Sequence, residues 1–201
     1  MSLDRAVEAA TVLLQERRSG AFTLADVAAR SGVSTGSIYA RVASKDDLIR
    51  VAHARTMDRL AAETAEAFGE PLPADAGIEK VVDQAVRRLA SLLQRHAPVL
   101  GPFMVVALGD PAIAVAGKDA HEGMVRAFAD LVLGARLEIG HPDPDAAVDW
   151  ACTVTYSVLA RQLGLDSGPD AAVPYAWDDL IANLRDMVLA YLTAGAHPPQ
   201  G

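Results

Sequence analysis

The stretch from residue 23 to residue 48, TLADVAARSGVSTGSIYARVASKDDL, constrains the fold more than any other part of the chain. Thr23 and Asp26 have the spacing of a capping box, in which each side chain accepts a hydrogen bond from the other residue's backbone N–H group, so a helix is expected to begin here. Gly32 suits the end of that helix, because glycine adopts positive φ without a Cβ penalty. Ser34 then caps a second short helix.

The second helix, expected over residues 35–41, presents only small side chains in its first turn: Ser34, Thr35, Gly36 and Ser37. Small polar groups let a helix N-terminus approach a polyanion closely, and the positive end of the helix dipole favours phosphate. Ile38 is expected to hold the helix in the core. Two short helices joined by a glycine turn form a helix-turn-helix, which predicts DNA binding.

A third helix start follows at Ser44, which has capping-box spacing to Asp47. Lys45 lies in the first turn of this helix, where a cation opposes the helix dipole. Stability alone does not explain a lysine at this position, whereas a nearby phosphate does.

These residues resemble the helix-turn-helix of the tetracycline-repressor (TetR) family of bacterial transcription regulators. The family pattern is matched by Val7, Ala10, Leu13, Leu14, Gly20, Phe22, Thr23, Val27, Ala28, Gly32, Val33, Ser34, Gly36, Ile38, Tyr39, Lys45 and Leu48. The resemblance implies that Tyr39 and Lys45 contact DNA phosphates. The chain departs from the family at Ala40 and Val42, where many members carry bulkier or aromatic residues, and these departures leave the operator sequence undefined.

We therefore expect residues 1–47 to form a DNA-binding domain and residues 48–201 to form a helical ligand-binding and dimerisation domain. Thr35 and Ser37 are expected to touch base edges or a thymine methyl group. The full predicted DNA-contact set is Thr23, Ser34, Thr35, Gly36, Ser37, Tyr39, Arg41 and Lys45.

The distribution of charge agrees with this division. The chain has a net charge of −8, but residues 1–60 carry nine Lys/Arg and seven Asp/Glu, whereas residues 61–201 carry nine and nineteen. The basic excess therefore lies in the predicted DNA-binding part, and the acidic remainder is expected to keep non-specific DNA affinity modest.

Apolar spacing and helix-breaking residues predict an all-α fold with about nine helices, a three-helix helix-turn-helix domain followed by a larger helical domain. Pro98 is expected to end one helix, and Pro144 to lie in the first turn of another. The helices expected after the helix-turn-helix span residues 45–68, 75–96, 99–108, 112–139, 144 to 163 or 165, and 176–192.

The last two long helices carry apolar residues over more than one narrow face. In the TetR family such helices form a four-helix dimer interface, and the resemblance implies a homodimer here; burial in the chain's own core is the alternative. One recognition helix reads few base pairs, so a two-fold partner would supply a second half-site on a palindromic operator. The predicted interface residues are Val154, Val158, Ile181, Leu184 and Val188.

Adaptable and aromatic side chains in the central helices suggest a site for a small-molecule effector. Ordinary core packing is the alternative explanation for each of them. The predicted effector-contact set is Phe103, Met104, His121, Met124, Phe128, Trp150 and Tyr156.

Other chemistry finds little support in the sequence. His121-Glu122 begins like a zinc-protease motif, but Val125 stands where the second histidine is required. There is no Gly-rich phosphate loop, no zinc-spaced cysteine pair and no nucleophile elbow, so neither an enzyme nor a metal or cofactor is expected. Cys152 is the single cysteine, and no apolar run reaches the roughly 20 residues of a membrane span. These features, without a recognisable signal peptide, favour a cytoplasmic protein.

The sequence thus predicts a ligand-responsive DNA-binding regulator, most simply a repressor released from its operator by an effector. A helical small-molecule-binding protein or an enzyme without DNA binding is the alternative.

Overall fold

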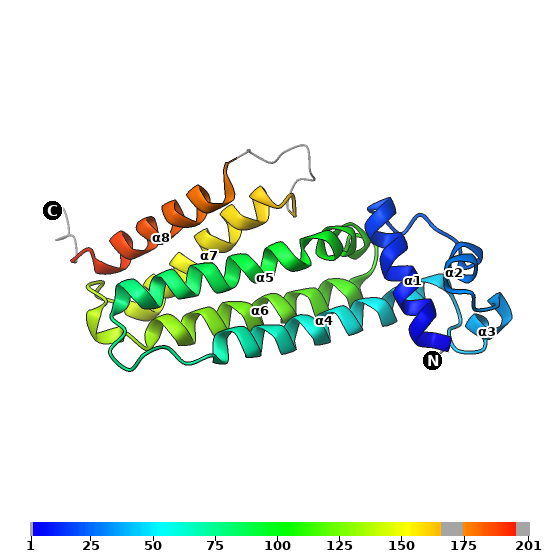
Figure 1. Ribbon diagram of the computed structural model, residues 1–201, viewed down its shortest axis with the longest axis horizontal. Coiled ribbons are helices and arrows are strands. Elements are labelled where there is room, and N and C mark those ends of the chain that lie inside the picture. The colour runs from blue at the N-terminus through cyan, green and yellow to red at the C-terminus, as the bar shows by residue number, and fades with distance from the viewer. Residues whose placement is uncertain (1, 166–174, 196–201) are drawn as a thin grey trace. The chain divides into compact units, whose positions relative to one another are not determined.

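The computed structural model describes residues 2–165 and 175–195, and within these residues it contains helices and no strand (Figure 1). The expected all-α fold is confirmed. The elements are α1 Ser2–Arg17, α2 Leu24–Ser31, α3 Thr35–Tyr39, α4 Lys45–Gly69, α5 Ile78–Ala107, α6 Pro111–Leu133, the 3-10 turn Arg136–Glu138, α7 Pro144–Gln162 and α8 Trp177–Thr193.

The helix ends predicted in the N-terminal part are confirmed. The backbone N–H of Asp26 donates to Thr23 Oγ1 at 3.1 Å, and the backbone N–H of Thr23 donates to Asp26 Oδ2 at 2.8 Å, which completes the capping box of α2. Gly32 has a φ of 64° and ends α2 with a hydrogen bond from its N–H to the Ala28 carbonyl oxygen. At α4, Ser44 Oγ accepts from the backbone N–H of Asp47 at 3.0 Å.

The expected helix end at Pro98 is wrong, because α5 continues through Pro98 and Pro102 to Ala107. Each proline removes one backbone N–H donor from the helix, but its fixed φ is compatible with helical geometry. The neighbouring apolar residues offset the lost hydrogen bonds by burial, with Val99 8% and Phe103 2% exposed. The two helices expected over residues 75–96 and 99–108 are therefore one, and the described residues form eight α-helices rather than nine.

Helix α6 is shorter than expected, because it ends at Leu133 and the chain then turns into the 3-10 segment Arg136–Glu138. Both α6 and α7 begin with an Asp-Pro pair. Asp110 Oδ1 accepts from the backbone N–H of Ala112 at 3.1 Å, and Asp143 Oδ1 accepts from that of Ala146 at the same distance. Each aspartate thus caps a helix whose first turn contains proline.

The chain divides into two compact units, residues 1–60 with 96–120 and residues 61–95 with 121–201. We call these the first and the second unit. In the first unit, the apolar faces of α1 to α4 share a core with Val99, Phe103 and Ile113, which come from α5 and α6. The division of the sequence near residue 47 stays a prediction.

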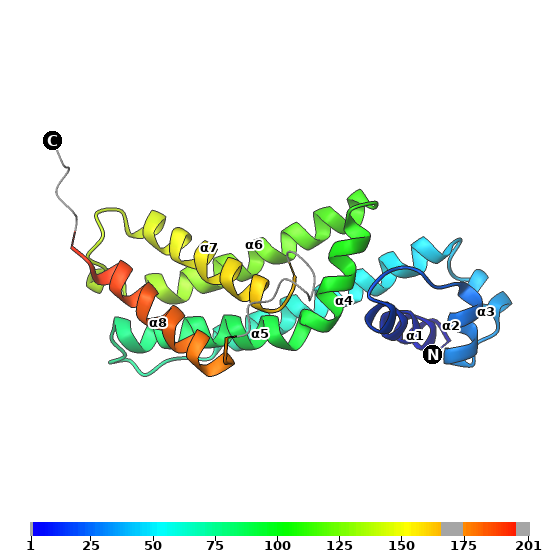
Figure 2. The same cartoon turned by 90° about the horizontal axis from the view of Figure 1, so that it is seen from above.

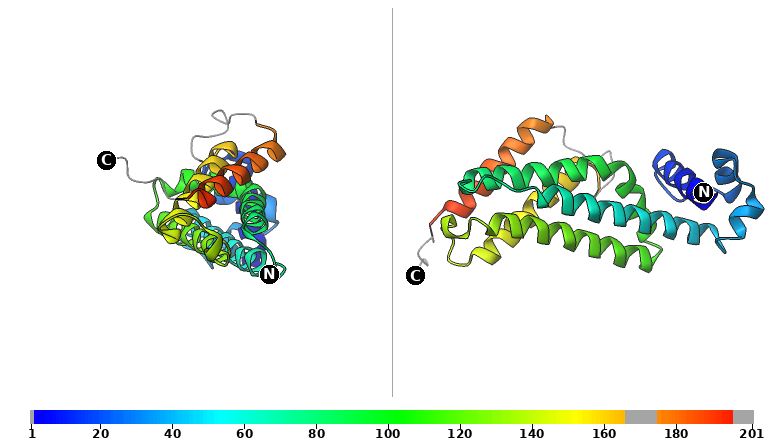
Figure 3. Two further views of the ribbon diagram at one scale, coloured as in Figure 1. Left: turned by 90° about the vertical axis from the view of Figure 1, so that its left-hand side faces the viewer. Right: turned by 60° about the horizontal axis from the view of Figure 1, so that its bottom comes forward.

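In the second unit, α7 and α8 pack against each other and run in opposite directions (Figure 2). The first part of α5 lies beside the end of α4, as Figure 3 shows, and Arg95 forms a 2.7 Å ion pair with Glu63 there. The core of this unit contains fully buried side chains such as Leu89, Phe128 and Leu159. No helix in the described part of the chain is long and apolar enough to cross a membrane.

Candidate nucleic-acid interface

Two serines cap the first turn of α3 and hydrogen-bond to each other. The backbone N–H of Ser37 donates to Ser34 Oγ at 3.2 Å, and the Ser34 hydroxyl donates to Ser37 Oγ at 2.8 Å. Ile38 is 1% exposed and anchors the opposite face of the helix in the core of the first unit. The small side chains of the first turn therefore face away from that core.

Gly36 has no packing reason to be glycine. It is exposed, and a Cβ built on it would meet no atom within 4 Å. Glycine inside a helix is less stable than alanine by about 1 kcal/mol, so this residue lowers helix stability without relieving a clash in the chain itself. A partner that approaches the α3 backbone closely would account for it.

Tyr39 and Arg41 follow on the exposed side of α3. Tyr39 is 56% exposed although it is large and aromatic. Arg41 Nη1 donates to the carbonyl oxygen of Ser37 at 3.2 Å, which fixes the guanidinium near the end of the helix. Both side chains can reach an external anion without disturbing the core.

Lys45 has an internal role that the sequence did not reveal. Its Nζ donates to the carbonyl oxygen of Gly20 at 2.8 Å and lies 5.7 Å from the centre of the Phe22 ring. The lysine thus joins the start of α4 to the segment between α1 and α2. An ammonium group has three donors, so this bond leaves donors for a phosphate.

Thr23 is committed to its capping box, and its hydroxyl also donates to Asp26 Oδ2 at 3.0 Å. The hydrogen bonds from the Thr23 backbone and hydroxyl, together with Arg17, hold the pKa of Asp26 below its ordinary value. The carboxylate therefore stays charged and the cap stays formed over the neutral pH range. The main effect of Thr23 in the free protein is to fix the start of α2.

The first unit also contains a polar cluster that the sequence pattern does not predict, formed by Arg50, His53 and Asp110. Arg50 Nε donates to Asp110 Oδ2 at 2.8 Å, and His53 packs edge-on against Phe103 with ring centroids 4.8 Å apart. Burial raises the pKa of Asp110, but the hydrogen bonds from Arg50 and from the start of α6 outweigh burial and bring the pKa below its ordinary value. Burial lowers the pKa of His53, which Asp110 partly opposes.

A sequence signal for this cluster existed, because Asp110-Pro111 repeats the Asp143-Pro144 pattern that marks the start of α7. Asp110 is 9% exposed and joins the start of α6 to α4 through Arg50. The ion pair itself links residues 60 positions apart and could not be read from local spacing.

The predicted effector-contact residues are divided between the two units. Phe103 and Met104 belong to the first unit, and the others belong to the second. His121 and Tyr156 meet edge-on with ring centroids 4.3 Å apart, and Met124 and Phe128 are buried, whereas Trp150 is 57% and Met104 37% exposed. Of the seven predicted residues, His121 and Tyr156 are therefore in direct contact, whereas Trp150 and Met104 lie at the surface.

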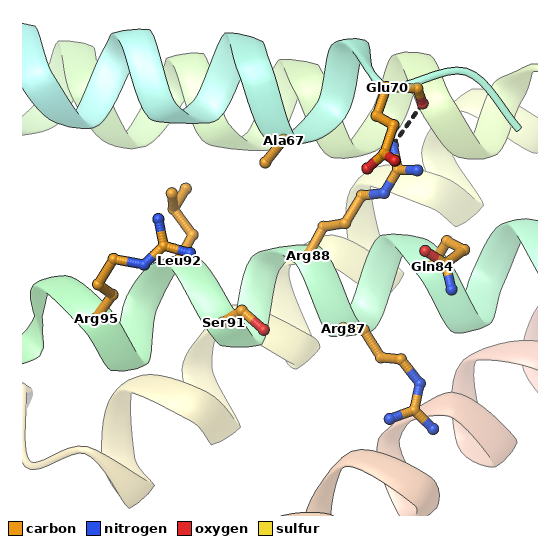
Figure 4. Close-up of a pocket in the computed structure, with 8 residues that line it drawn as sticks. All are labelled: Ala67, Glu70, Gln84, Arg87, Arg88, Ser91, Leu92 and Arg95. Carbon is orange, nitrogen blue, oxygen red and sulfur yellow. Dashed lines mark hydrogen bonds between the residues drawn. The ribbon is translucent and has the colours of Figure 1, made fainter.

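A surface hollow between α4 and α5 in the second unit is lined by other residues (Figure 4). These are Ala67, Glu70, Gln84, Arg87, Arg88, Ser91, Leu92 and Arg95. Its arginines have partners: Arg88 donates to the carbonyl oxygen of Glu70 at 2.9 Å, and Arg87 and Arg95 pair with Asp83 and Glu63. The hollow contains none of the predicted effector contacts.

The predicted interface residues differ in burial. Ile181, Leu184 and Val188 on α8 are 4%, 4% and 1% exposed, so they pack within the chain itself. Val154 and Val158 on α7 are half-buried. The large apolar side chains that are exposed on this pair of helices are instead Trp150 at 57% and Met187 at 44%.

The helix-turn-helix region matches a known protein family. Residues 6–52 match the family described as "Bacterial regulatory proteins, tetR family". This range contains most of α1, all of α2 and α3, and the start of α4, including the capped starts of these last three helices. None of the curated proteins matches the chain.

Solved structures share the fold over nearly the whole chain. A TetR-family transcriptional regulator from Rhodococcus sp. has a TM-score of 0.67 at 16% identity, with 96% of this chain and 99% of that chain covered. GusR from Salmonella enterica has a TM-score of 0.64 at 19% identity, with 96% of each chain covered. FadR from Bacillus halodurans, described as a fatty acid degradation regulator, has a TM-score of 0.63 at 16% identity, with 94% of each covered.

The helix-turn-helix match and the shared fold define the chain as a DNA-binding transcription regulator. Within that class, residues 6–52 match the helix-turn-helix domain of the TetR family, and the fold of the chain is that of solved TetR-family regulators. TetR-family regulators are DNA-binding proteins rather than enzymes, which agrees with the expectation from the sequence.

Proposed function

We propose that the protein is a repressor that binds a palindromic operator as a symmetric dimer and leaves it when a small-molecule effector binds. The observation that carries the DNA part is the first turn of α3. There, exposed Gly36 has no internal reason to lack a side chain, and small hydroxyl groups surround it. A helix of this kind fits a major groove, which admits an α-helix.

Roles within the surface follow from burial and hydrogen bonding. Thr35 is half-buried and precedes Gly36, where its hydroxyl and methyl groups can meet a base edge or a thymine methyl. Tyr39, Arg41 and Lys45 contact phosphates and set the position of α3, because phosphate contacts fix register while base contacts specify sequence.

A symmetric dimer is supported by the outer face of α7. Trp150, Val154 and Val158 are spaced four residues apart and therefore lie on one side of that helix. Trp150 and Met187 are large apolar side chains that the chain leaves exposed on packed helices. A second copy would cover them, while buried Leu184 and its neighbours support the interface from within.

The effector part of the proposal is supported by the second unit. His121, Met124 and Phe128 are spaced three and four residues apart on one side of α6, and His121 contacts Tyr156 of α7. An effector releases DNA only if it binds one dimer state more tightly than the other.

DNA binding can be tested by fluorescence anisotropy of a labelled duplex of random sequence, titrated with protein at low salt. We expect binding that weakens steeply as salt rises, because phosphate contacts release counterions. An acidic surface repels DNA, so binding requires the basic part of the chain. The proposal would be contradicted if the anisotropy stayed constant at low salt. Lys80→Ala, which removes an exposed charge from α5, is a control that should leave binding unchanged.

A further inference from the structure

One ring nitrogen in the second unit is buried without a hydrogen-bond partner. It is Nδ1 of His121, within the part of the chain that the structure describes. A buried polar atom that lacks a partner costs about 1–3 kcal/mol relative to one that has a partner. The edge-on contact with Tyr156, 4.3 Å between ring centroids, stabilises the imidazole ring but gives this nitrogen no hydrogen bond.

The His121 imidazole is itself uncharged at neutral pH. Burial lowers the pKa of His121, and the nearby Glu122 only partly opposes that shift, so the imidazole stays neutral. Burial raises the pKa of Tyr156, and it raises that of Cys152, one helical turn earlier on α7, to about 12. Imidazole, phenol and thiol are therefore all present in their uncharged forms.

The rest of the core agrees with an uncharged site. Among the described residues of the second unit, the buried polar side chains are Thr64 and Thr155. The Thr155 hydroxyl donates to the Ala151 carbonyl oxygen at 2.7 Å. A charged ligand group would find no partner of opposite charge among the buried side chains described in this unit. Burying an unpaired charge is far more costly than burying a hydrogen-bonded neutral group.

We propose that His121 and Tyr156 bind the polar end of an uncharged effector, whose apolar part packs along α6 against Met124 and Phe128. The single polar group of such a molecule would be a hydroxyl or carbonyl that bonds Nδ1 of His121. Fatty acids, other anions and cationic drugs are excluded as effectors by this assignment. The inference rests on the proposal above that the helical body binds an effector.

The test uses four probes of one shape and different end groups: para-butylphenol, butylbenzene, para-butylbenzoate and para-butylbenzylammonium. Binding to the full-length protein is measured by calorimetric titration at neutral pH. We expect para-butylphenol to bind about ten-fold more tightly than butylbenzene, the gain from one buried hydrogen bond, and the two charged probes to bind more weakly than either. His121→Phe, which keeps the ring and removes the nitrogens, should abolish the preference for the phenol.

His53→Phe is the matched control, because it makes the same change at a buried histidine of the first unit and should leave the preference intact. If His121→Phe does not fold, the ring ¹⁵N resonance of His121 decides, since it should shift with the phenol and not with butylbenzene. A charged probe that binds as tightly as the phenol, or a preference that survives His121→Phe, would overturn the inference. So would the absence of binding by every probe.

The same preparation, titrated with duplex DNA, separates the two proposals. If the protein binds DNA but none of the probes, the proposed class of effector is wrong and the proposed regulatory function is unaffected. If it binds the phenol through His121 but binds no duplex, the proposed regulatory function is wrong and the proposed His121 site is unaffected.

Discussion

Lys45 Nζ donates a 2.8 Å hydrogen bond to the carbonyl oxygen of Gly20, so the lysine predicted to bind phosphate also links α4 to the segment between α1 and α2. Lys45→Ala should therefore lower both DNA affinity and the free energy of unfolding. The phosphate role alone lowers the slope of log affinity against log salt by about one. Affinity and slope are measured by anisotropy, and unfolding by urea titration.

Lys80→Ala removes a lysine from the acidic body and should change neither quantity. If Lys45→Ala lowers stability while the salt slope stays that of the unmodified protein, the lysine is structural and its assignment to phosphate is wrong.

Gly36→Ala should move stability and DNA affinity in opposite directions. The added methyl meets nothing in the protein and favours the helix by up to about 1 kcal/mol, so the melting temperature should rise or stay the same. On DNA the same methyl overfills a close contact, which costs typically about 1–3 kcal/mol. Thermal unfolding and operator binding measure the two effects.

Gly117→Ala is the matched control for Gly36→Ala. Gly117 lies inside α6, and a Cβ there also meets no atom within 4 Å. This variant should gain stability and keep full DNA affinity. Equal DNA binding by Gly36→Ala and the unmodified protein would show that α3 does not approach DNA closely.

Trp150→Glu should convert the dimer to a folded monomer. The tryptophan is 57% exposed, so glutamate is tolerated in one chain, but in the dimer its charge would be buried without a partner at a cost of several kcal/mol. Light scattering gives the oligomeric state and circular dichroism checks the fold. Leu137→Glu, at an apolar side chain that is fully exposed in the 3-10 turn, should remain dimeric.

Leu184→Glu gives a different result, because Leu184 is 4% exposed in its own chain. The substitution should unfold the helical body rather than only separate the protomers. A monomeric unmodified protein at micromolar concentration would contradict the dimer itself.

Stability should fall as pH drops below neutral, partly through His53. Burial lowers the pKa of His53 below its ordinary value of 6.5, so between the folded and unfolded pKa values the unfolded chain binds more protons. The stability contribution of neutral His53 is therefore present above pH 6.5 and is lost as pH falls toward the lower, folded pKa. His53→Phe should reduce the pH dependence of the free energy of unfolding, measured by urea titration from pH 7.5 to 5. Part of the dependence should remain because burial also lowers the pKa of His121. An unchanged pH dependence in this variant would contradict the prediction.

Local chemistry was enough to predict the N-terminal part of the fold. The Thr23–Asp26 box, the Gly32 turn and the Ser34 cap each involve residues a few positions apart, and each is present. The helix end predicted at Pro98 is wrong, because α5 continues through this proline to Ala107. Burial of Val99 and Phe103 in a core shared with the helix-turn-helix was invisible to local spacing.

Long-range contacts limited the prediction of the sites. His121 and Tyr156 were named from residue type, and their contact across α6 and α7 needed the structure. The Arg50–Asp110 pair and the internal bond of Lys45 join distant segments and left no periodic signal. On α8, apolar spacing predicts Ile181, Leu184 and Val188 at a dimer interface, whereas in the structure they are buried within their own chain and Met187 is exposed.

The central claim is that α3 of each protomer reads one half of a two-fold symmetric DNA site. Selection of bound duplexes from a random library at fixed salt, followed by sequencing, tests it most directly. The account predicts a palindrome whose half-sites are about 34–36 Å apart or a multiple of that spacing, and a changed preference at one position of each half for Thr35→Ala. No enriched sequence, or an enriched site without two-fold symmetry, would contradict it.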